Sequence, residues 1–359
     1  MKKKTLEELR DELRRKDLEI VELLNERARI SVEVGRVKGT GGFEVYDPAQ
    51  ESRVYGQAKK VNRGPLTDYA LKSIFREILS SSRVLQKKET VVYLGPEASF
   101  SHLAALSHFG KSTDLVPAVS IPDVFKTVEG EKADCGVVPV ENSVEGSVKQ
   151  TLDRLVVTPL TVRAEIFQRI SHCLLSPGVD LSAVRRVYSH PQALAQCQGW
   201  LRAHLPDRPL MEMPSTAAAA RRVLEEKEGA AIGSALAAEV YGLNVLVQGI
   251  EDEPLNTTRF LVVGRGRNTA TGMDKTSIVF GTPHVPGALY SVLEPIARAK
   301  LNMLRIESYP LRDRMWEYLF FVDLAGHDED EKIVDCIKEM EKRATFIKVL
   351  GSYPRGNGQ

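Results

Sequence analysis

The N-terminus contains one long helical stretch, which constrains the fold more than any other feature of the chain. Thr5 and Glu8 match the capping-box pattern that begins a helix, and the pattern continues until Gly39, Gly41 and Gly42 stop it. Such a helix is about 50 Å long at ~1.5 Å per residue. Two short helices of the same chain cannot cover that length. We therefore expect a helix of a second subunit to cover the apolar side chains Leu6, Leu9, Leu13, Ile20, Leu24 and Val34.

Two shorter helices complete an all-α segment. Asp47 and the proline after it form a helix start, and a third helix is expected over residues 67–86. Arg27 and Lys38 are eleven positions apart, so they share a face of the first helix. Arg10 lies roughly 100° from Arg27 around the same helix. A dimer resolves this mismatch, because Arg10 can then serve the site of the other subunit.

These helices resemble the all-helical chorismate mutase family, in which two subunits exchange their long helices. The matching segments are residues 9–10, 23–27, 32–38 and 47–51 together with Ser82 and Gln86. The family rearranges a diacid, which requires a compact substrate conformer and fixed positive charge but no nucleophile. The resemblance implies that Arg10 and Arg27 bind carboxylates, that Lys38 and Gln86 donate to the ether oxygen, and that Asp47 and Glu51 orient the hydroxyl side. The implied chorismate-binding residues are Arg10, Arg27, Lys38, Asp47, Glu51, Ser82 and Gln86.

One position departs from that family. Gln50 stands where the family usually has arginine, and Arg53 is a candidate replacement. Gln50 also fits a capping box with Asp47. An alternative for this segment is therefore a dimerisation arm without mutase activity.

The middle of the chain alternates buried strands with polar turns and helices. Val91–Leu94 precedes Ser99, and Cys135–Val140 precedes Glu141 and Asn142. A third strand ends at Ser189, with Gln196 in the helix that follows. Open α/β sheets bind ligands where strands end in such turns. Capping is the alternative role for Glu141, Asn142 and Ser189.

The segment Asn256–Phe260 places a threonine beside an arginine at the start of a buried strand. Thr258 supplies a hydroxyl, and Arg259 supplies a guanidinium that can grip carboxylates. With the preceding blocks, this motif closely resembles the prephenate dehydratase family over residues 89–267. The resemblance implies two α/β lobes of the periplasmic-binding-protein kind, with the site in the cleft between them.

Prephenate becomes aromatic when it loses carbon dioxide and hydroxide, so a placed donor near the leaving hydroxyl suffices. By resemblance Thr258 is that donor, and Arg259 fixes the motif or a substrate carboxylate. Glu141 shapes the site. The remaining implied residues supply hydrogen bonds, and they are Ser99, Asn142, Ser189 and Gln196.

After a polar linker at residues 267–274, the pattern reads β-α-β-β-α-β, which resembles a ferredoxin-like ACT regulatory domain. Residues 286–289 and 307–310 match the two phenylalanine-binding signatures of dehydratases. Tyr309 replaces the usual arginine, which leaves effector strength open. The implied phenylalanine-binding residues are Gly287, Ala288, Leu289, Asn302, Glu307 and Ser308.

Composition excludes several other classes. The chain has 49 Lys and Arg against 48 Asp and Glu, without the basic excess of a nucleic-acid binder. No apolar run is long enough for a membrane span. The four scattered cysteines indicate buried thiols in a reducing compartment, so we expect a cytoplasmic protein. The histidines lack metal-ligand spacing, and neither metal nor cofactor is expected.

The sequence thus predicts a multidomain enzyme of phenylalanine biosynthesis: an all-α mutase (1–88), a two-lobed α/β dehydratase (89–267) and an α+β ACT domain (275–359). It would convert chorismate to prephenate and then to phenylpyruvate, with feedback inhibition by phenylalanine, as a homodimer or homotetramer. Three alternatives remain: a dehydratase with a non-catalytic helical arm, an arogenate dehydratase, and a non-catalytic aromatic amino-acid sensor.

Overall fold

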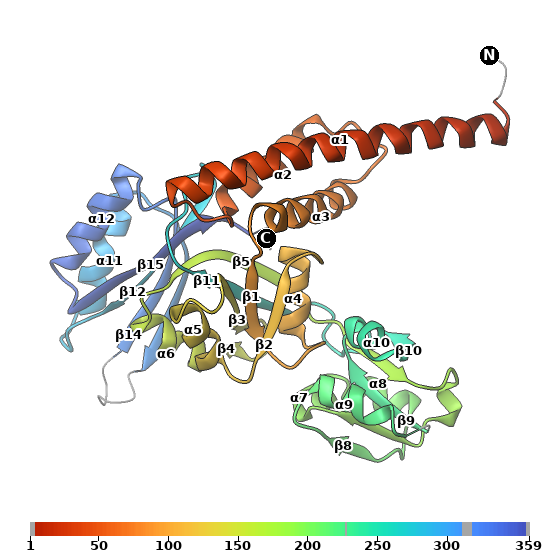
Figure 1. Cartoon of the computed structure of the whole chain (residues 1–359). Helices are drawn as coiled ribbons and strands as arrows, with labels where there is room; N and C mark the ends of the chain where they lie inside the picture. Colours follow the sequence, from red (N-terminus) through yellow and green to blue (C-terminus); the bar gives the residue numbers. More distant parts are fainter. Residues whose placement is uncertain (1–3, 227, 311–317, 357–359) are drawn as a thin grey trace. The chain divides into compact units, whose positions relative to one another are not determined.

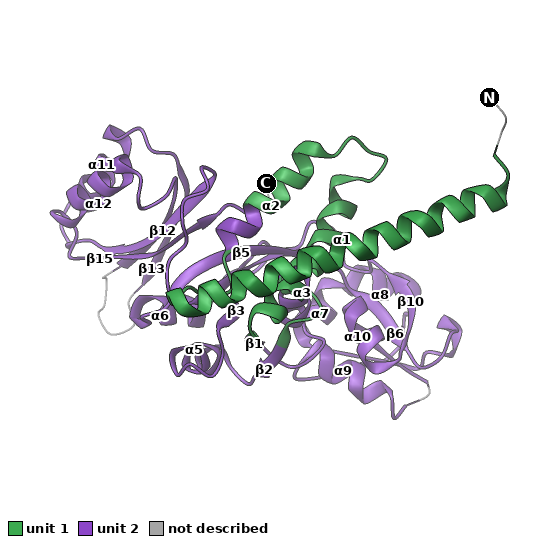
Figure 2. Ribbon diagram, turned by 45° about the horizontal axis from the view of Figure 1, so that its top comes forward, with its two compact units in different colours: residues 1–47, 53–89, 109–114 green, residues 48–52, 90–108, 115–359 purple. Residues whose placement is uncertain are grey.

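The computed structural model describes residues 4–226, 228–310 and 318–356. Figure 2 colours the two compact units into which the chain divides. The first contains residues 1–47, 53–89 and 109–114, and the second contains residues 48–52, 90–108 and 115–359.

The first unit is helical. Its longest element, α1 (Leu6–Gly41), begins at a complete capping box between Thr5 and Glu8 and ends at Gly42, whose φ of 69° is left-handed. The other helices are α2 (Pro48–Val61), whose first turn belongs to the second unit, and α3 (Asp68–Gln86). These bounds confirm the three predicted helices. The predicted apolar seam on α1 is exposed in the single chain; Leu6, for example, is 65% exposed.

The second unit contains two α/β sheets. The first has the order β2-β1-β3-β11-β5, with β4 paired to β3, and the second has the order β10-β6-β9-β7-β8. The strands of the first sheet are β1 (Thr90–Leu94), β2 (Asp114–Ala118), β3 (Cys135–Asn142), β4 (Gly146–Ser147), β5 (Thr161–Arg169) and β11 (Thr257–Gly264). Those of the second are β6 (Cys173–Ser176), β7 (Arg186–Ser189), β8 (Leu210–Glu212), β9 (Gly229–Gly233) and β10 (Asn244–Gln248). The chain therefore leaves the first sheet after β5 and returns to it as β11.

Helices connect these strands, and three of them, α5, α9 and α10, begin at serine caps. Ser120 caps α5 by accepting from the Asp123 N–H. Ser215 caps α9 and Ser234 caps α10, each by accepting a hydrogen bond from a backbone N–H of the first turn. The helices are α4 (Phe100–Phe109), α5 (Ile121–Glu129), α6 (Lys149–Val157), α7 (Pro191–Gln196), α8 (Gln198–His204), α9 (Thr216–Val223) and α10 (Ala235–Tyr241).

The C-terminal part of the second unit is a four-stranded sheet with two helices on one face (Figure 1). Its order β13-β14-β12-β15 is that of a ferredoxin-like fold. Its elements are β12 (Asp274–Gly281), α11 (Ala288–Arg298), β13 (Met303–Pro310), β14 (Tyr318–Ala325), α12 (Glu331–Glu341) and β15 (Phe346–Pro354). The predicted fold class is confirmed in its helical, α/β and α+β parts.

The other face of this C-terminal sheet joins the core of the first α/β sheet. Phe321 and Tyr353 belong to the same buried apolar cluster as Leu152 and Leu261. The polar stretch expected to be a linker is also tied down, because buried Asn268 donates to the backbone oxygens of Arg163 and Ser352.

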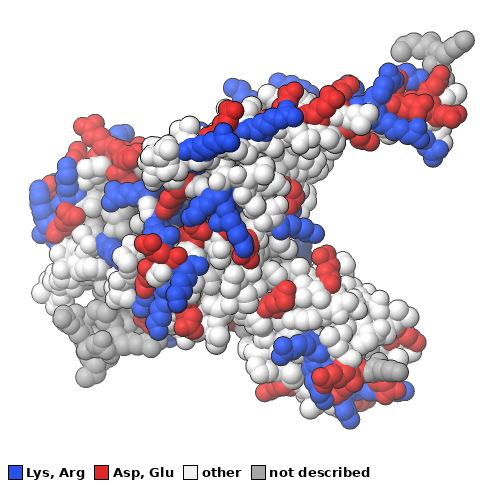
Figure 3. All heavy atoms as spheres, in the orientation of Figure 1, with Lys and Arg blue, Asp and Glu red and all other residues white. Residues whose placement is uncertain are grey.

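All four cysteines are buried, as predicted. On the face drawn in Figure 3, basic and acidic side chains are interspersed, in keeping with the nearly balanced charge. Among the described residues, no helix combines the length and apolarity that a membrane crossing requires.

Candidate functional site

Strands β3 and β11 bring Thr258 and Asn142 together at their ends. The two residues are register partners, and Asn142 Nδ2 donates to Thr258 Oγ1 at 2.8 Å and to Asn256 Oδ1 at 2.7 Å. Asn142 Oδ1 accepts from the backbone N–H groups of Val144 (2.9 Å) and Glu145 (3.1 Å). Because those donors fix the oxygen side of the amide, its nitrogen side must face Thr258. Asn142 therefore holds the β3–β4 turn and does not cap a helix.

Thr258 is 8% exposed, and its oxygen acts as a hydrogen-bond acceptor. Its hydroxyl hydrogen has no acceptor within the described part of the chain. A hydroxyl also donates, so Thr258 retains a donor for another molecule. This arrangement fits the role implied for it.

Gln196, at the end of α7, extends the polar cluster. Its Oε1 lies 3.2 Å from Asn256 Nδ2 and 2.9 Å from His172 Nε2, and its Nε2 lies 3.3 Å from Glu145 Oε1. His172 is 2% exposed, and burial lowers its pKa, which favours the neutral ring. We refer to Thr258, Asn142, Asn256, Gln196 and His172 as the amide cluster.

Sequence reasoning missed His172, Asn256 and Glu145 as members or neighbours of this cluster. Asn256 opens the Thr-Arg-Phe motif, so its position was a usable signal. His172 follows β5 directly before the buried strand β6, which is another polar residue at a strand boundary.

Arg259 and Glu141 lie on the opposite face of the sheet from the amide cluster. They are register partners one position along from Thr258 and Asn142, and side chains alternate between faces along a strand. Arg259 Nε donates to Glu165 Oε2 at 2.9 Å, and its Nη2 lies 2.9 Å from Asp323 Oδ2 and donates to Tyr353 Oη at 3.0 Å. Of the two expected roles of Arg259, these contacts favour fixing the motif.

Ser189 and Ser99 have backbone partners. Ser189 is fully buried and donates to the Ile232 oxygen at 2.8 Å. Ser99 donates to the Leu94 oxygen at 3.2 Å and accepts from the His102 backbone N–H at the start of α4. No hydrogen bond within the described ranges joins either serine to the amide cluster. The cap of α7 is His190, not Ser189.

The first unit brings several of the expected chorismate ligands together. Arg27 donates to Ser82, which lies on α3. Gln86 lies against Gly35, where an added Cβ would be 2.8 Å from Gln86 Cα. Lys38 Nζ donates to the Glu44 and Val45 oxygens, each at 3.0 Å.

The remaining residues of that set occupy other positions. Arg10 is exposed near the start of α1. Asp47 directly precedes α2, and Glu51 lies in the first turn of α2.

The expected phenylalanine ligands surround the start of α11 and strand β13. Gly287 has a left-handed φ of 79° and is followed by Ala288 and Leu289, the first residues of α11. Glu307 and Ser308 lie on β13, and Asn302 directly precedes it, with its backbone oxygen accepting from Ala325.

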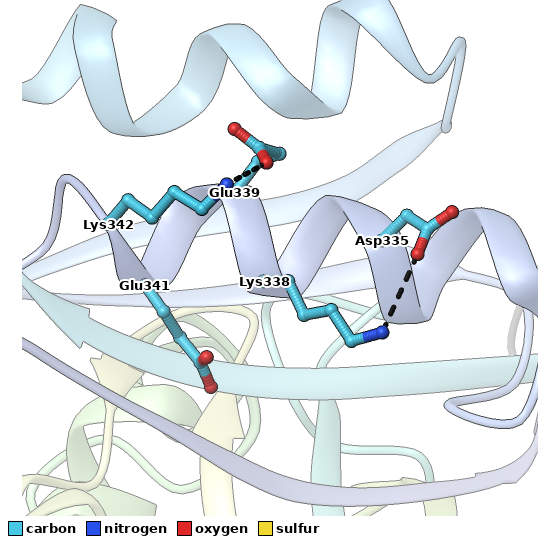
Figure 4. Close-up of a pocket in the computed structure, with 5 residues that line it drawn as sticks. All are labelled: Asp335, Lys338, Glu339, Glu341 and Lys342. Carbon is cyan, nitrogen blue, oxygen red and sulfur yellow. Dashed lines mark hydrogen bonds and ion pairs between the residues drawn. The ribbon is translucent and has the colours of Figure 1, made fainter.

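Two further features of the C-terminal part lie outside this set of ligands. Tyr309 is buried and donates to Asp153 of α6. Figure 4 shows a separate hollow on α12, where Lys338 Nζ lies 3.7 Å from Asp335 Oδ1 and Lys342 pairs with Glu339.

Comparisons with known proteins agree with this architecture. Residues 9–87 match the chorismate mutase type II family, residues 91–268 match prephenate dehydratase, and residues 276–342 match the ACT domain. The chain is 43% identical to a bifunctional chorismate mutase/prephenate dehydratase of Aquifex aeolicus, over 98% of each protein. It is also 43% identical to a protein of the same description from Neisseria gonorrhoeae, over 94% of each.

A solved structure of prephenate dehydratase from Arthrobacter aurescens, in complex with L-Phe, is similar as well. It is 35% identical with a TM-score of 0.69, and the match covers 75% of this chain and 91% of that one. The chain belongs to the bifunctional chorismate mutase/prephenate dehydratase family. It is thus an isomerase and a lyase of aromatic amino-acid biosynthesis, acting in the formation of phenylalanine.

Proposed function

We propose that the dehydratase reaction takes place at the amide cluster. The observation that carries this proposal is the hydroxyl of Thr258, which accepts from Asn142 and keeps its own hydrogen for a substrate. When prephenate decarboxylates, the electrons of the broken C–C bond enter the ring and the ring hydroxyl departs as hydroxide. A hydrogen bond from Thr258 stabilises the charge on that oxygen. Solvent supplies the proton that converts hydroxide to water.

Other residues of the expected set have positioning roles in this scheme. Arg259 and Glu141 hold the strand ends from the opposite face, and Gln196 connects the second sheet to the cluster. Ser99 accepts a hydrogen bond from the first turn of α4, and Ser189 of β7 donates to the backbone of β9. Their hydrogen bonds fix the framework on which the amide cluster stands.

We propose that the mutase site is built around Arg27, Ser82 and Gln86, with Lys38 nearby. A substrate carboxylate would replace Ser82 as the hydrogen-bond acceptor of Arg27, because an ionised acceptor makes the stronger hydrogen bond. Burial lowers the pKa of Arg27, because it disfavours the charged guanidinium. A bound carboxylate would stabilise that charge. Arg10 of the partner subunit would supply a second cation, and Asp47 and Glu51 would orient the hydroxyl side. Exposed leucines on α1 support a dimer; a tetramer is the alternative.

We propose that phenylalanine binds the C-terminal domain and inhibits the dehydratase. The L-Phe complex of the Arthrobacter aurescens protein supports this ligand. The proposed contacts are Gly287, Ala288, Leu289, Asn302, Glu307 and Ser308. The proposed domains are residues 1–88, 89–267 and 275–359. The matched family ranges support them, although the dehydratase match ends one residue later, at residue 268. The buried free cysteines support a cytoplasmic location.

A coupled assay that starts from chorismate and measures phenylpyruvate, with and without phenylalanine, tests the whole proposal. Thr258→Val should lower dehydratase turnover at least ~10²-fold, the usual range for loss of a hydrogen-bond donor to developing charge, and spare mutase turnover. Thr257→Val is the matched control, because that hydroxyl donates only weakly to the Leu255 oxygen at 3.4 Å. Arg27→Ala should lower mutase turnover and leave dehydratase turnover unchanged.

Each alternative predicts a different outcome in that assay. A non-catalytic helical arm predicts no mutase turnover in the wild type. An amino-acid sensor predicts no phenylpyruvate at any enzyme concentration, and an arogenate dehydratase prefers arogenate when both substrates are compared. Equal loss of both activities in Thr258→Val would contradict the assignment of separate sites.

A further inference from the structure

Arg305 of β13 lies between two carboxylates that belong to different parts of the second unit. Its Nε is 3.0 Å from Glu141 Oε2, and its Nη2 donates to Glu307 on the same strand. Nη2 also lies 3.4 Å from Ser147 Oγ on β4. One guanidinium therefore connects the strand that carries the proposed phenylalanine ligands with the β3–β4 turn of the dehydratase.

That turn is the part of the dehydratase that holds Asn142. Glu141 directly precedes Asn142 and is the register partner of Ser147, so Arg305 binds both sides of the turn. Asn142 Oδ1 accepts from two backbone N–H groups inside the same turn. A displacement of the turn would therefore move Asn142 Nδ2 relative to Thr258.

A second connection between the same two sheets is buried and consists of side chains of opposite charge that lie close together. Arg259 and Lys275 are cationic, Glu165 and Asp323 are anionic, and Tyr353 completes the set; all are at most 9% exposed. Breaking such a buried pair is expensive. In contrast, the side chains of Arg305, Glu307 and Glu141 are 17%, 22% and 37% exposed. The Arg305 contacts are therefore the ones that a small ligand can reach and exchange.

We propose that Arg305 is a positioning residue of the dehydratase site and transmits the binding of phenylalanine to it. The inference rests on the proposed effector site at Glu307. The ammonium group of phenylalanine competes with Arg305 for the Glu307 carboxylate. Arg305 then keeps only its contacts with Glu141 and Ser147. The β3–β4 turn shifts as a result, and the Asn142 amide no longer lies in position to donate to Thr258.

The test separates effector binding from inhibition in the full-length enzyme. Arg305→Gln and Glu141→Gln are compared with Arg298→Gln, an exposed arginine of α11 that pairs only with Glu294 among the described residues. Calorimetry gives the Kd for phenylalanine, and dehydratase assays give kcat, KM and the IC50. In Arg305→Gln and Glu141→Gln we expect phenylalanine to bind still, while the ratio of IC50 to Kd rises at least about tenfold, within the usual range of allosteric coupling. Mutase turnover and the Arg298→Gln ratio should remain at wild-type values.

The outcomes distinguish this inference from the effector proposal. If the ratio of IC50 to Kd stays at the wild-type value in both variants, Arg305 carries no coupling and the inference is wrong. If Glu307→Gln binds phenylalanine as tightly as the wild type, the effector site itself is misplaced, and the inference fails with it. A rise in KM with unchanged kcat and an unchanged ratio would indicate only a structural role for Arg305, which also overturns it.

Discussion

At the scale of single residues, Thr258 and Arg259 are neighbours whose side chains serve opposite faces of one sheet. The register with β3 shifts between Arg259 and Phe260, at the site itself, and such bulges re-aim side chains. Burial favours the neutral form of Asp323, but Arg259 and Lys275 outweigh it and hold the pKa of Asp323 below its ordinary value. This charged cluster on one face thereby fixes the strand whose other face carries the proposed catalytic hydroxyl of Thr258.

Asn142→Asp tests the role of the amide at this scale. The carboxylate keeps the acceptor for the Val144 and Glu145 N–H groups but loses the donor to Thr258. An ionised carboxylate would instead accept the Thr258 hydrogen. We expect dehydratase kcat to fall about 10²-fold, as for loss of a placed donor, in a variant that still folds. Steady-state kinetics and thermal denaturation check this, and wild-type kcat in the folded variant would contradict it.

At the scale of elements, the packing of α1 on α3 depends on Gly35. A Cβ at this position would lie 2.8 Å from Gln86 Cα and 2.9 Å from Gln86 Cβ, which is closer than real contacts allow. Glycine lowers the helix propensity of α1 at this position, but its missing side chain lets the two helices approach. It also places the proposed mutase ligand Gln86 against α1.

Gly35→Ala and Gly39→Ala form a matched pair in one helix. The first forces α3 and Gln86 away from α1, so mutase turnover should fall at least ~10-fold, as expected when a donor to a transition state is displaced. The second meets nothing within 4 Å, so it should raise helix stability by up to about 1 kcal/mol and leave turnover unchanged. Mutase assays and thermal inactivation measure both effects. Equal mutase turnover and equal stability of the two variants would show that the packing of α1 on α3 does not depend on Gly35.

At the scale of the whole molecule, the C-terminal sheet is not a loosely attached appendage of the dehydratase. Its β15 packs on β5, where Gly351, with a φ of 147°, lies so close that a Cβ would be 2.4 Å from the Val162 oxygen. The shared core includes Tyr353, Phe321 and Leu261. Removing the sheet would expose this core and leave Arg259 and Glu165 without Asp323 and Lys275.

A chain that ends after residue 267 should therefore be less stable in its dehydratase part. Loss of a few kcal/mol shifts the melting temperature of a domain of this size by about 5 °C or more. The temperature that inactivates the dehydratase should fall by that amount, whereas the inactivation temperature of the mutase should not change. Thermal inactivation of both activities in one sample checks this, and an unchanged dehydratase value would show that the shared core adds nothing.

The sequence by itself determined the elements whose signals are local. Thr5 with Glu8 and Gly42 set the ends of α1, because caps act within one turn. The polar residues of the N-terminal helices indicated the mutase family, and the strand-and-turn blocks with the Thr-Arg-Phe motif indicated the dehydratase family. Only the tertiary structure decided which face each motif residue serves. The direction of Arg259, the approach of His172 to Gln196 and the bridge made by Arg305 depend on strand register and on sheets far apart in the chain. Those relations arise from long-range pairing and packing, which the spacing of residues along the sequence does not specify.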